Sequence, residues 1–465
     1  MKIEFLNTSY THNNPKCHPY NFGYNQRQPI NLPIKDTVSF GQAVPQSAIK
    51  YLKSKKIELY SLGLDKYFLQ LFDAKQLEGI QNGIEIFNGL SFSQIAYMVN
   101  NLTGIILQRG CTNSCIHCFA EAKPPYFMKK NNFIEKIDFE DYEKLCNGFK
   151  ELNKRLGFNV FSNGSKSLFY DSDCSMIYMQ DKSGKMYDYA DLAKMFHEAA
   201  KQRILFDTAG WNKNDTKTQK RMEDLVKKIA NSNEYDFLQF NISVNPFHSI
   251  YSKSLDLKAQ GKTKEAKRLE EIFTDRIANV IFTSSPLIDK TNSYTNKSML
   301  GFIFRGLFDF TDLDGYHAHD LICMFDDIAE RVGKLYEEDL ASGRHKVIKN
   351  QEQLDKYYYF LKGRVHSRIE LINMTNERLI NKLGDIDAGE WNILRQYSFN
   401  SVKEGIKFTD GFIDVNGKFY MTNYMETYPT DIAINYTTKG KSTAPIRPNL
   451  RDGVITKDII EEYYS

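Results

Sequence analysis

Short apolar runs alternate with amphipathic segments through the middle of the chain. Each run is short enough for a buried strand, and the five runs span residues 104–108, 167–170, 204–206, 237–244 and 299–304. Strands that alternate with helical segments favour a parallel sheet covered by helices. The pattern therefore predicts an α/β fold.

The segments between the apolar runs have the residue spacing of amphipathic helices. Asp138 is a candidate N-cap for the first helix, and Gly157 is a candidate for its end. Between these two residues, apolar side chains recur at steps of three and four, at Tyr142, Leu145, Phe149, Leu152 and Leu156. The same spacing predicts helices over residues 192–199 and 215–229, and the segment 254–289 is mostly helical in pattern.

These patterns divide the chain into four parts. Residues 1–46 are rich in Asn, Pro, Gln and Tyr, carry no charged-then-apolar signal pattern, and are expected to form a mostly irregular arm. Helical segments in residues 47–101 predict a helical lead-in, and the alternating runs place the core in residues 102–321. Long polar helices and a hairpin in residues 322–465 predict an α+β C-terminal extension.

The hairpin of the C-terminal extension is expected where Asn416 and Gly417 separate two alternating segments. An Asn-Gly pair in this setting favours a type I′ turn, because both residues tolerate a positive φ angle. One arm of the hairpin would supply the last strand of the core sheet.

Composition narrows the class of protein without indicating an activity. The 465 residues are 42% apolar and 26% charged, as in an ordinary soluble globular protein, and no apolar run approaches the length of a membrane span. Lys and Arg number 61 against 58 Asp and Glu, so the chain has no basic footprint for nucleic acid or an anionic membrane. The patterns GxxxxGK(S/T), GxGxxG and GxSxG are absent, which removes the simplest arguments for NTPase, dinucleotide or serine-hydrolase chemistry.

The feature that carries chemistry is the segment RGCTNSCIHCF, which follows the first apolar run. Cys111, Cys115 and Cys118 stand there at C-x3-C-x2-C spacing. A loop this short can turn three thiolates toward one point, which suits a [4Fe-4S] cluster with three protein-ligated irons and one open iron. The open iron has a coordination site at which a reaction can take place.

Two other uses of the cysteines fit less well. A structural zinc site needs a fourth ligand, and His117 is too close to the triad to complete a tetrahedron easily. The other four cysteines share no motif spacing: Cys17, Cys146, Cys174 and Cys323. Disulfides are disfavoured because the total of seven is odd and no secretory segment is recognisable. Cys146 and Cys323 lie in helical segments and are expected to be small buried residues.

The cysteine triad in the loop after a first strand resembles the radical S-adenosylmethionine (radical SAM) superfamily. The resemblance implies a partial (β/α)6 barrel over about residues 102–321, with ligands at the carboxyl ends of its strands. It implies that Cys111, Cys115 and Cys118 ligate a [4Fe-4S] cluster whose open iron binds S-adenosyl-L-methionine. Reductive cleavage of that cofactor would give methionine and a 5′-deoxyadenosyl radical, which takes a hydrogen atom from the substrate.

The resemblance also implies residues that contact S-adenosylmethionine. His117 occupies a position that is commonly aromatic in the family and would pack near the adenine, although a loop histidine without a special role is an equal alternative. After the second strand, where the family often has a Gly-Gly-Glu-like segment, this chain departs from the pattern with the polar segment DSDC. Ser172 and Asp173 are the candidates there for binding the amino group of the cofactor, and an Asx-rich turn is the alternative.

Two further strand ends carry polar residues. The third run ends in DTAG, which resembles the Thr-x-Gly ending of many family members and makes Thr208 a candidate for cofactor binding. On the next strand, Asn241, Ser243 and Asn245 alternate onto one face. We expect Ser243 and Asn245 to bind the ribose hydroxyls or the carboxylate of the cofactor, and a buried water or backbone network is the alternative.

Together these features predict a cytoplasmic radical SAM enzyme that uses a single cluster, with no catalytic residue assigned beyond the cluster ligands. The substrate is unknown, and a small molecule or a peptide is favoured over RNA because no basic extension is present. A low-potential electron donor such as flavodoxin or ferredoxin is the expected partner, and no association with a membrane is expected. The alternative is a non-catalytic interaction protein in which the triad holds zinc or an iron-sulfur cluster.

Overall fold

The computed structural model describes part of the chain, namely residues 79–111, 113, 135–157, 159–161, 165–168, 172–244, 248–304, 318–363, 410–422, 427–436 and 457–458. All of them belong to the compact unit Val44–Ser465. The expected N-terminal arm, residues 1–46, lies outside the described residues, and so does the lead-in as far as residue 78.

A mostly parallel sheet of eight strands forms the centre of this unit and confirms the predicted α/β class. Six of its strands are mutually parallel: β1 (Leu102–Ile105), β4 (Ser165–Ser167), β7 (Arg203–Thr208), β8 (Leu238–Val244), β11 (Leu300–Phe304) and β12 (Asp410–Ile413). Two antiparallel strands, β13 (Lys418–Thr422) and β14 (Thr427–Ala433), extend it at one edge. The order across the sheet is β11-β8-β7-β4-β1-β12-β13-β14.

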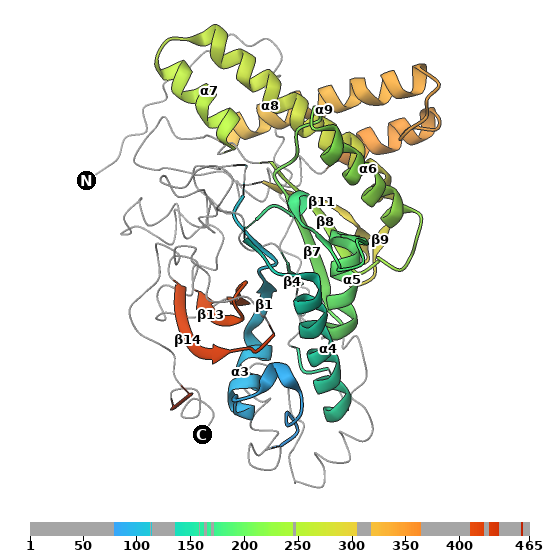
Figure 1. Ribbon diagram of the computed structural model, residues 1–465. Coiled ribbons are helices and arrows are strands. Elements are labelled where there is room, and N and C mark those ends of the chain that lie inside the picture. Colours follow the sequence, from blue (N-terminus) through green and yellow to red (C-terminus); the bar gives the residue numbers. More distant parts are fainter. Residues whose placement is uncertain are drawn as a thin grey trace, which may run out of the picture. The chain divides into compact units, whose positions relative to one another are not determined.

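The first five parallel strands cross the sheet in chain order, each beside the one before it. Right-handed crossovers that always step in the same direction place their helices on the same face of a sheet. Accordingly, α4 (Phe139–Leu156), α5 (Tyr189–Ala200) and α6 (Thr216–Ala230) lie on one side of the strands (Figure 1), and α8 (Thr263–Ser284) packs against α6 and β8. This part of the sheet is therefore wound in one direction only.

The two faces of the sheet differ in polarity. On the face covered by helices, Phe206 of β7 stacks on Phe240 of β8 with ring centroids 4.1 Å apart, and Tyr189 of α5 packs against Phe206. On the opposite face, Asn241 Nδ2 donates a hydrogen bond of 2.7 Å to Asp207 Oδ1, and both side chains are half-buried. The alternation along each strand thus separates an apolar core from a polar face.

The predicted helices are present, with small differences in their bounds. α4 begins after the N-cap residue Asp138 and ends at Gly157, which adopts a left-handed φ of 75° and donates its N–H to Asn153 O. In the lead-in, α3 (Phe92–Asn101) begins with a capping box between Ser91 and Gln94. The segment 254–289 is mostly helical, as predicted, and consists of the end of α7 (Ser249–Ala259), then α8 and the short 3-10 helix Ser285–Asp289; Gly261, with a φ of 75°, separates α7 from α8.

Strand bounds were predicted less accurately than helices. The second core strand was expected at residues 167–170, but β4 spans Ser165–Ser167 and pairs with β7 from Ser165 to Ser167. The prediction started too late because the segment Ser-Lys-Ser carries no apolar signal. Its pairing comes from the neighbouring strands rather than from its own composition.

The predicted C-terminal hairpin is present, and its first arm extends the sheet, because β12 lies parallel to β1 and antiparallel to β13. The expected type I′ turn is wrong: Gly417 has a positive φ of 81°, but Asn416 does not. The connection is a three-residue loop, closed by a bond from Gly417 N to Asp414 O, with Gly417 in the left-handed conformation. The Asp414 carboxylate determines this geometry, since its Oδ1 accepts the N–H groups of Asn416 and Lys418 at 2.8 and 3.0 Å.

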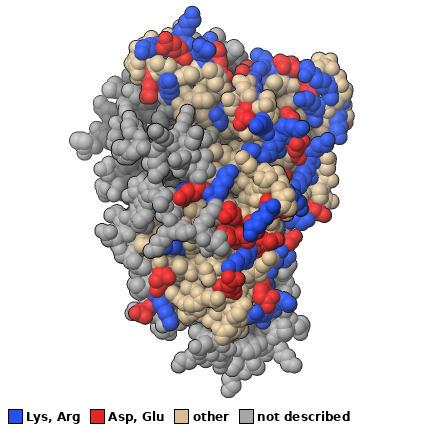
Figure 2. Space-filling view, in the orientation of Figure 1, with Lys and Arg blue, Asp and Glu red and all other residues tan. Residues whose placement is uncertain are grey.

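α9 (Ala318–Ala341) lies beside α8 and contacts it through an ion pair of 2.6 Å between Arg331 Nε and Asp275 Oδ1. Residues 351–363 form a further helix, which contacts α9 through an ion pair of 3.1 Å between Lys362 Nζ and Asp326 Oδ1. None of the helices in the described ranges is long and apolar enough to cross a membrane. Basic and acidic side chains intermingle over the face shown in Figure 2, so this face presents no large patch of a single charge.

Candidate functional site

The cysteine loop leaves the sheet at the carboxyl end of β1. Directly after it, β2 (Gln108–Arg109) pairs antiparallel with β3 (Glu135–Lys136). The segment 110–134, which holds all three motif cysteines, therefore begins and ends at this short ladder. Cys111 is described and half-exposed, whereas Cys115, Cys118 and the adenine-packing candidate His117 lie outside the described residues.

Asn113 connects the cysteine loop to the end of the neighbouring strand. Its backbone N–H donates to Cys111 Sγ at 3.4 Å, and its side-chain Nδ2 donates to Asp173 Oδ2 at 2.9 Å. Asn113 is only 7% exposed, so these bonds are shielded from water. The middle of the C-x3-C spacing is thereby attached to the segment that follows β4.

Asp173 is the centre of a buried group of hydrogen bonds. Its Oδ1 accepts from Thr208 Oγ1 at 2.7 Å and from both N and Oγ of Ser175 at 2.9 and 2.6 Å. Its Oδ2 accepts from Ala209 N at 2.7 Å as well as from Asn113. Five donors fill the acceptor capacity of one carboxylate. Asp173 therefore joins the ends of β4 and β7 to the cysteine loop.

Arg276 brings a positive charge to the same place from α8. Its Nη2 donates to Asn113 Oδ1 at 2.8 Å and also to Gly210 O, just after β7. Asn113 thus has one amide atom bonded toward Asp173 and the other toward Arg276. We refer to Asn113, Asp173, Ser175, Thr208 and Arg276 as the interior network.

A second set of contacts holds the base of the cysteine loop. Gln108 Nε2 donates to Ser172 Oγ at 2.6 Å, and Ser172 Oγ donates to Gly110 O at 3.0 Å. On the other side, Arg109 Nη2 lies 3.4 Å from Asp414 Oδ2, at the end of β12. Burial raises the pKa of Asp414, although the charge of Arg109 acts in the opposite direction. The loop base is therefore bonded to the ends of both neighbours of β1.

His248 lies at the same edge of the sheet, at the start of α7. It is fully buried, and its Nδ1 accepts the N–H of Ile250 at 3.3 Å. Burial and the nearby charge of Arg276 lower the pKa of His248 to about 3, so the imidazole is neutral at physiological pH. Its buried Nε2 meets no hydrogen-bond partner in the described part of the chain.

The structure brings four of the predicted site residues together. Asn113 links Cys111 to Asp173, Asp173 accepts a hydrogen bond from Thr208, and Ser172 is bonded to the base of the same loop. Ser243 is buried one strand away, on the face that carries Asn241, and Asn245 lies outside the described residues. The predicted proximity of the strand ends is thus present for β1, β4 and β7.

The sequence interpretation missed the residues that connect the site. Asn113 stands inside the motif spacing but carries no signal of its own. Arg276 occupies a helix position between the buried residues Phe273 and Ile277, where a charged residue is unusual and needs a polar partner. This charged residue at a buried helix position was the one sign in the sequence that could have pointed to Arg276.

Cys146 and Cys174 are buried residues of the core, whereas the side chain of Cys323 lies outside what the structure describes. Cys146 in α4 is fully buried, as predicted, and burial raises the pKa of its thiol to about 12. Cys174 accepts the N–H of Asp207 at 3.1 Å, and burial together with the charges of Asp207 and Asp173 raises its pKa. Within the described ranges, no three His, Cys, Asp or Glu side chains are grouped to hold a metal ion, and two of the three motif cysteines lie outside those ranges.

Fold and site together define an α/β protein with a cysteine loop bonded over the carboxyl ends of parallel strands. Comparison with family models, curated proteins and solved structures found no match to this chain. Any assignment of function therefore depends on the geometry of this site and on the chemistry of its residues.

Proposed function

We propose that this protein is a radical SAM enzyme that binds one [4Fe-4S] cluster through Cys111, Cys115 and Cys118. The observation that carries the proposal is the position of the cysteine loop. It emerges at the carboxyl end of β1 and is bonded to the ends of β4 and β7. Ligand sites of parallel α/β folds gather at this end of the strands.

The winding of the sheet supports a partial (β/α)6 barrel as the finer description of the fold. Barrels carry their helices on one face, as the part of the sheet from β1 to β11 does here. β12 provides a sixth parallel strand, although it pairs with β1 rather than with β11 in the described residues. The polar face with Asp207 and Asn241 would then line the interior of the barrel.

The described residues fit a cluster bound through thiolates. Cys111 is half-exposed and accepts an N–H from Asn113, which stabilises a thiolate, and Arg276 adds a nearby positive charge. When bound, the cluster and S-adenosyl-L-methionine would supply reductive cleavage to methionine and a 5′-deoxyadenosyl radical. The residues bonded to Asn113 would orient the start of the loop.

Cofactor contacts can be proposed at two places. The buried Oε1 of Gln108 accepts no hydrogen bond from any described group, and it lies on the side chain that donates to Ser172. An ammonium group there would have Gln108 and Ser172 as acceptors. Asp173 would act by positioning these segments, because its oxygens already accept five bonds.

The other contacts with S-adenosylmethionine remain as the resemblance implies them. His117 would pack near the adenine, and Ser243 and Asn245 would bind the ribose or the carboxylate. We propose a cytoplasmic enzyme that takes electrons from a donor such as flavodoxin or ferredoxin. Its substrate would be a small molecule or a peptide rather than RNA.

Anaerobic reconstitution followed by dithionite reduction tests this proposal. With S-adenosylmethionine, the intact protein should form 5′-deoxyadenosine, and the triple variant Cys111→Ala, Cys115→Ala, Cys118→Ala should form none. Failure of the intact protein to form it with a fully loaded, reduced cluster would contradict the proposal. Bound zinc without any spectral response to the cofactor would favour the non-catalytic interaction protein.

A further inference from the structure

We propose that Asn113 is a positioning residue that fixes the start of the cysteine loop, at Cys111, before any metal is bound. The inference rests on the proposed function only for the identity of the bound group, since the geometry concerns the thiol-bearing loop itself. Asn113 is the middle one of the three residues between Cys111 and Cys115. Fixing it limits the conformations open to Cys111, two residues before it.

The two polar atoms of the Asn113 side chain are held by partners of opposite charge. Nδ2 donates to the Asp173 carboxylate at 2.9 Å, and Oδ1 accepts from the Arg276 guanidinium at 2.8 Å. A reversed amide would place an oxygen against a carboxylate and a donor against a guanidinium, so only one orientation is compatible. The side chain is therefore held in a single rotamer.

The two partners are themselves held by other elements. Asp173 is bonded to Thr208 and Ala209 at the end of β7, and Arg276 extends from α8 to Gly210 O. None of these bonds involves a motif cysteine. The position of Asn113 is thus set by the sheet and by α8, which exist whether or not a metal is bound.

This position has a direct effect on the first motif cysteine. The Asn113 N–H donates to Cys111 Sγ at 3.4 Å. Hydrogen bonds to ligand sulfur lower the charge on it and influence both metal affinity and reduction potential. Replacing Asn113 by Ala keeps the backbone N–H but removes the two side-chain bonds that hold it in place.

A matched control is available in α4. Asn153 Nδ2 donates to Ala199 O at 2.6 Å, and its Oδ1 accepts from Val160 N at 2.9 Å, so this amide also bonds at both ends. It connects the end of α4 to α5, and neither of these contacts involves the cysteine loop. Asn153→Ala should lower stability in a similar way without changing the loop.

Titration of the anaerobic, metal-free full chain with Co²⁺ measures the loop directly, because thiolate-bound Co²⁺ has an intense charge-transfer absorption. Asn113→Ala should bind Co²⁺ about 10- to 100-fold more weakly than the wild type, the usual effect of losing an outer-shell contact. Asn153→Ala should bind it with unchanged affinity. Equal affinity in wild type and Asn113→Ala, or an equal loss in Asn153→Ala, would overturn the inference.

A second variant covers the case in which Asn113→Ala does not fold. Arg276→Met removes the donor to Asn113 Oδ1 while keeping most of the aliphatic stem, and it should also weaken Co²⁺ binding. A folded Arg276→Met protein with wild-type affinity would overturn the inference. In the reconstituted protein, Asn113→Ala should further alter the electron paramagnetic resonance signal of the reduced cluster.

The two proposals can fail separately. Weaker Co²⁺ binding by Asn113→Ala, together with no 5′-deoxyadenosine from the intact protein, would support the positioning role and contradict the radical SAM function. Formation of 5′-deoxyadenosine with identical Co²⁺ affinities would do the reverse. A wild-type chain without any thiolate band on Co²⁺ addition would overturn the positioning role outright.

Discussion

Two carboxylates that cap helical turns differ in how far they are buried and in how many residues they bond. Asp173 caps the turn Cys174–Met176 and accepts the N–H of Ser175, while Asp188 caps α5 and accepts the N–H of Asp191. Asp173 is 4% exposed and bonds to four other residues of the described chain. The Asp188 side chain is 22% exposed and shares a lysine with a second carboxylate.

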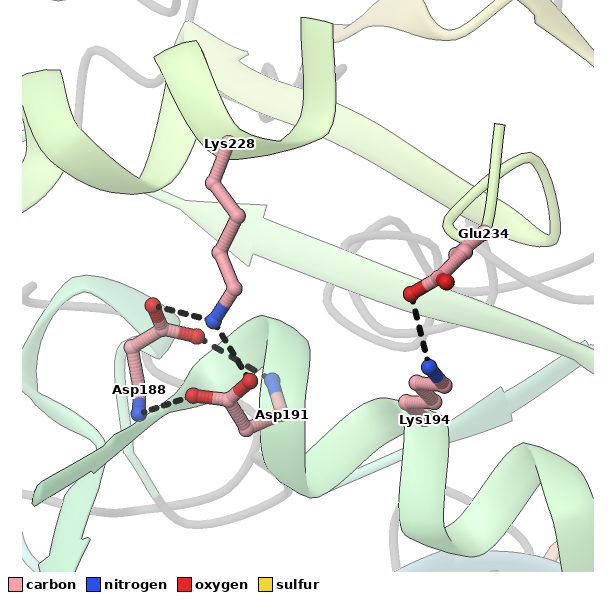
Figure 3. A network of polar contacts seen from close by, with 5 residues as sticks. All are labelled: Asp188, Asp191, Lys194, Lys228 and Glu234. Carbon is pink, nitrogen blue, oxygen red and sulfur yellow. Dashed lines mark hydrogen bonds and ion pairs between the residues drawn. The ribbon is translucent and has the colours of Figure 1, made fainter. Parts of the chain in front are cut away.

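Figure 3 shows this surface network, which consists of Asp188, Asp191 and Lys228. Lys228 Nζ lies 3.0 Å from Asp188 Oδ2 and 2.5 Å from Asp191 Oδ1, and so connects α6 to α5. Nearby, Lys194 and Glu234 form a separate ion pair of 2.8 Å. Burial and the charge of Asp191 raise the pKa of Asp188, against the effect of Lys228.

The difference between the networks lies in what replaces a lost bond. Water can solvate the surface carboxylates when Lys228 is removed, so the net contribution of such pairs is small. Around Asp173, the donors of Asn113, Ser175 and Thr208 are buried, and a buried donor without an acceptor is costly. The interior network therefore fixes the positions of the segments that it joins, whereas we expect the surface network to add little to the free energy of unfolding.

Removing the central carboxylate should have the largest effect. Asp173→Ala leaves the donors of Asn113, Ser175, Thr208 and Ala209 without acceptors, and we expect a loss of about 3 to 5 kcal/mol. Urea unfolding of the full chain measures it. Asp188→Ala is the matched surface control and should lose about 1 kcal/mol, mainly its capping bond. Equal losses in the two variants would contradict the contrast between the networks.

The pH dependence of stability should reveal His248 beside the interior network. The unfolded chain takes up a proton on this residue as the pH falls through about 6.5, but the folded chain does so only at about 3. Stability from His248 is therefore present above pH 6.5 and is lost as the pH falls toward 3, by about 3 kcal/mol at pH 4.

Replacing His248 by Asn isolates this contribution, because Asn keeps an acceptor for the N–H of Ile250 at the start of α7. The difference in unfolding free energy between wild type and His248→Asn should shrink or reverse between pH 7 and pH 4. A difference that stays constant over this range would show that the folded protein protonates His248 normally.

One hydroxyl of the interior network should account for less than the central carboxylate. Thr208→Val keeps the shape of the side chain and removes the donor to Asp173 Oδ1 at 2.7 Å together with the acceptor of the Gly210 N–H at 3.0 Å, so we expect a loss of about 1 to 2 kcal/mol. Thr218→Val is a control, since its hydroxyl bonds to Asp215 at 2.7 Å on the exposed start of α6. Thermal unfolding should separate the two, and a larger loss in the control would refute the ranking.

The surface network should show the smallest effect. Lys228→Met is expected to cost about 0.5 kcal/mol at low ionic strength and nearly nothing at high salt. Lys194→Met, which removes the neighbouring pair with Glu234, should behave alike. A loss of several kcal/mol that persists in 1 M salt would mean that Lys228 belongs to the folded core.

Local patterns in the sequence predicted most of the described elements. The cap positions and apolar spacing of α4 depend on residues within one helix, so the sequence specifies them before any tertiary contact forms. β4 was misplaced because its polar residues gain their strand pairing from β7. The turn at Gly417 was misjudged because the Asp414 side chain competes with the preference of the Asn-Gly pair.

For the candidate site, the sequence supplied the candidates Cys111, Ser172, Asp173 and Thr208, the last three through the resemblance to the radical SAM superfamily. Only the tertiary structure decided how they are connected. Asn113 and Arg276 stand 163 residues apart, and Asn113 and Asp173 stand 60 apart. Periodicity records which face a residue occupies in its own element, but bonds between distant elements exist only once the sheet and α8 have packed together.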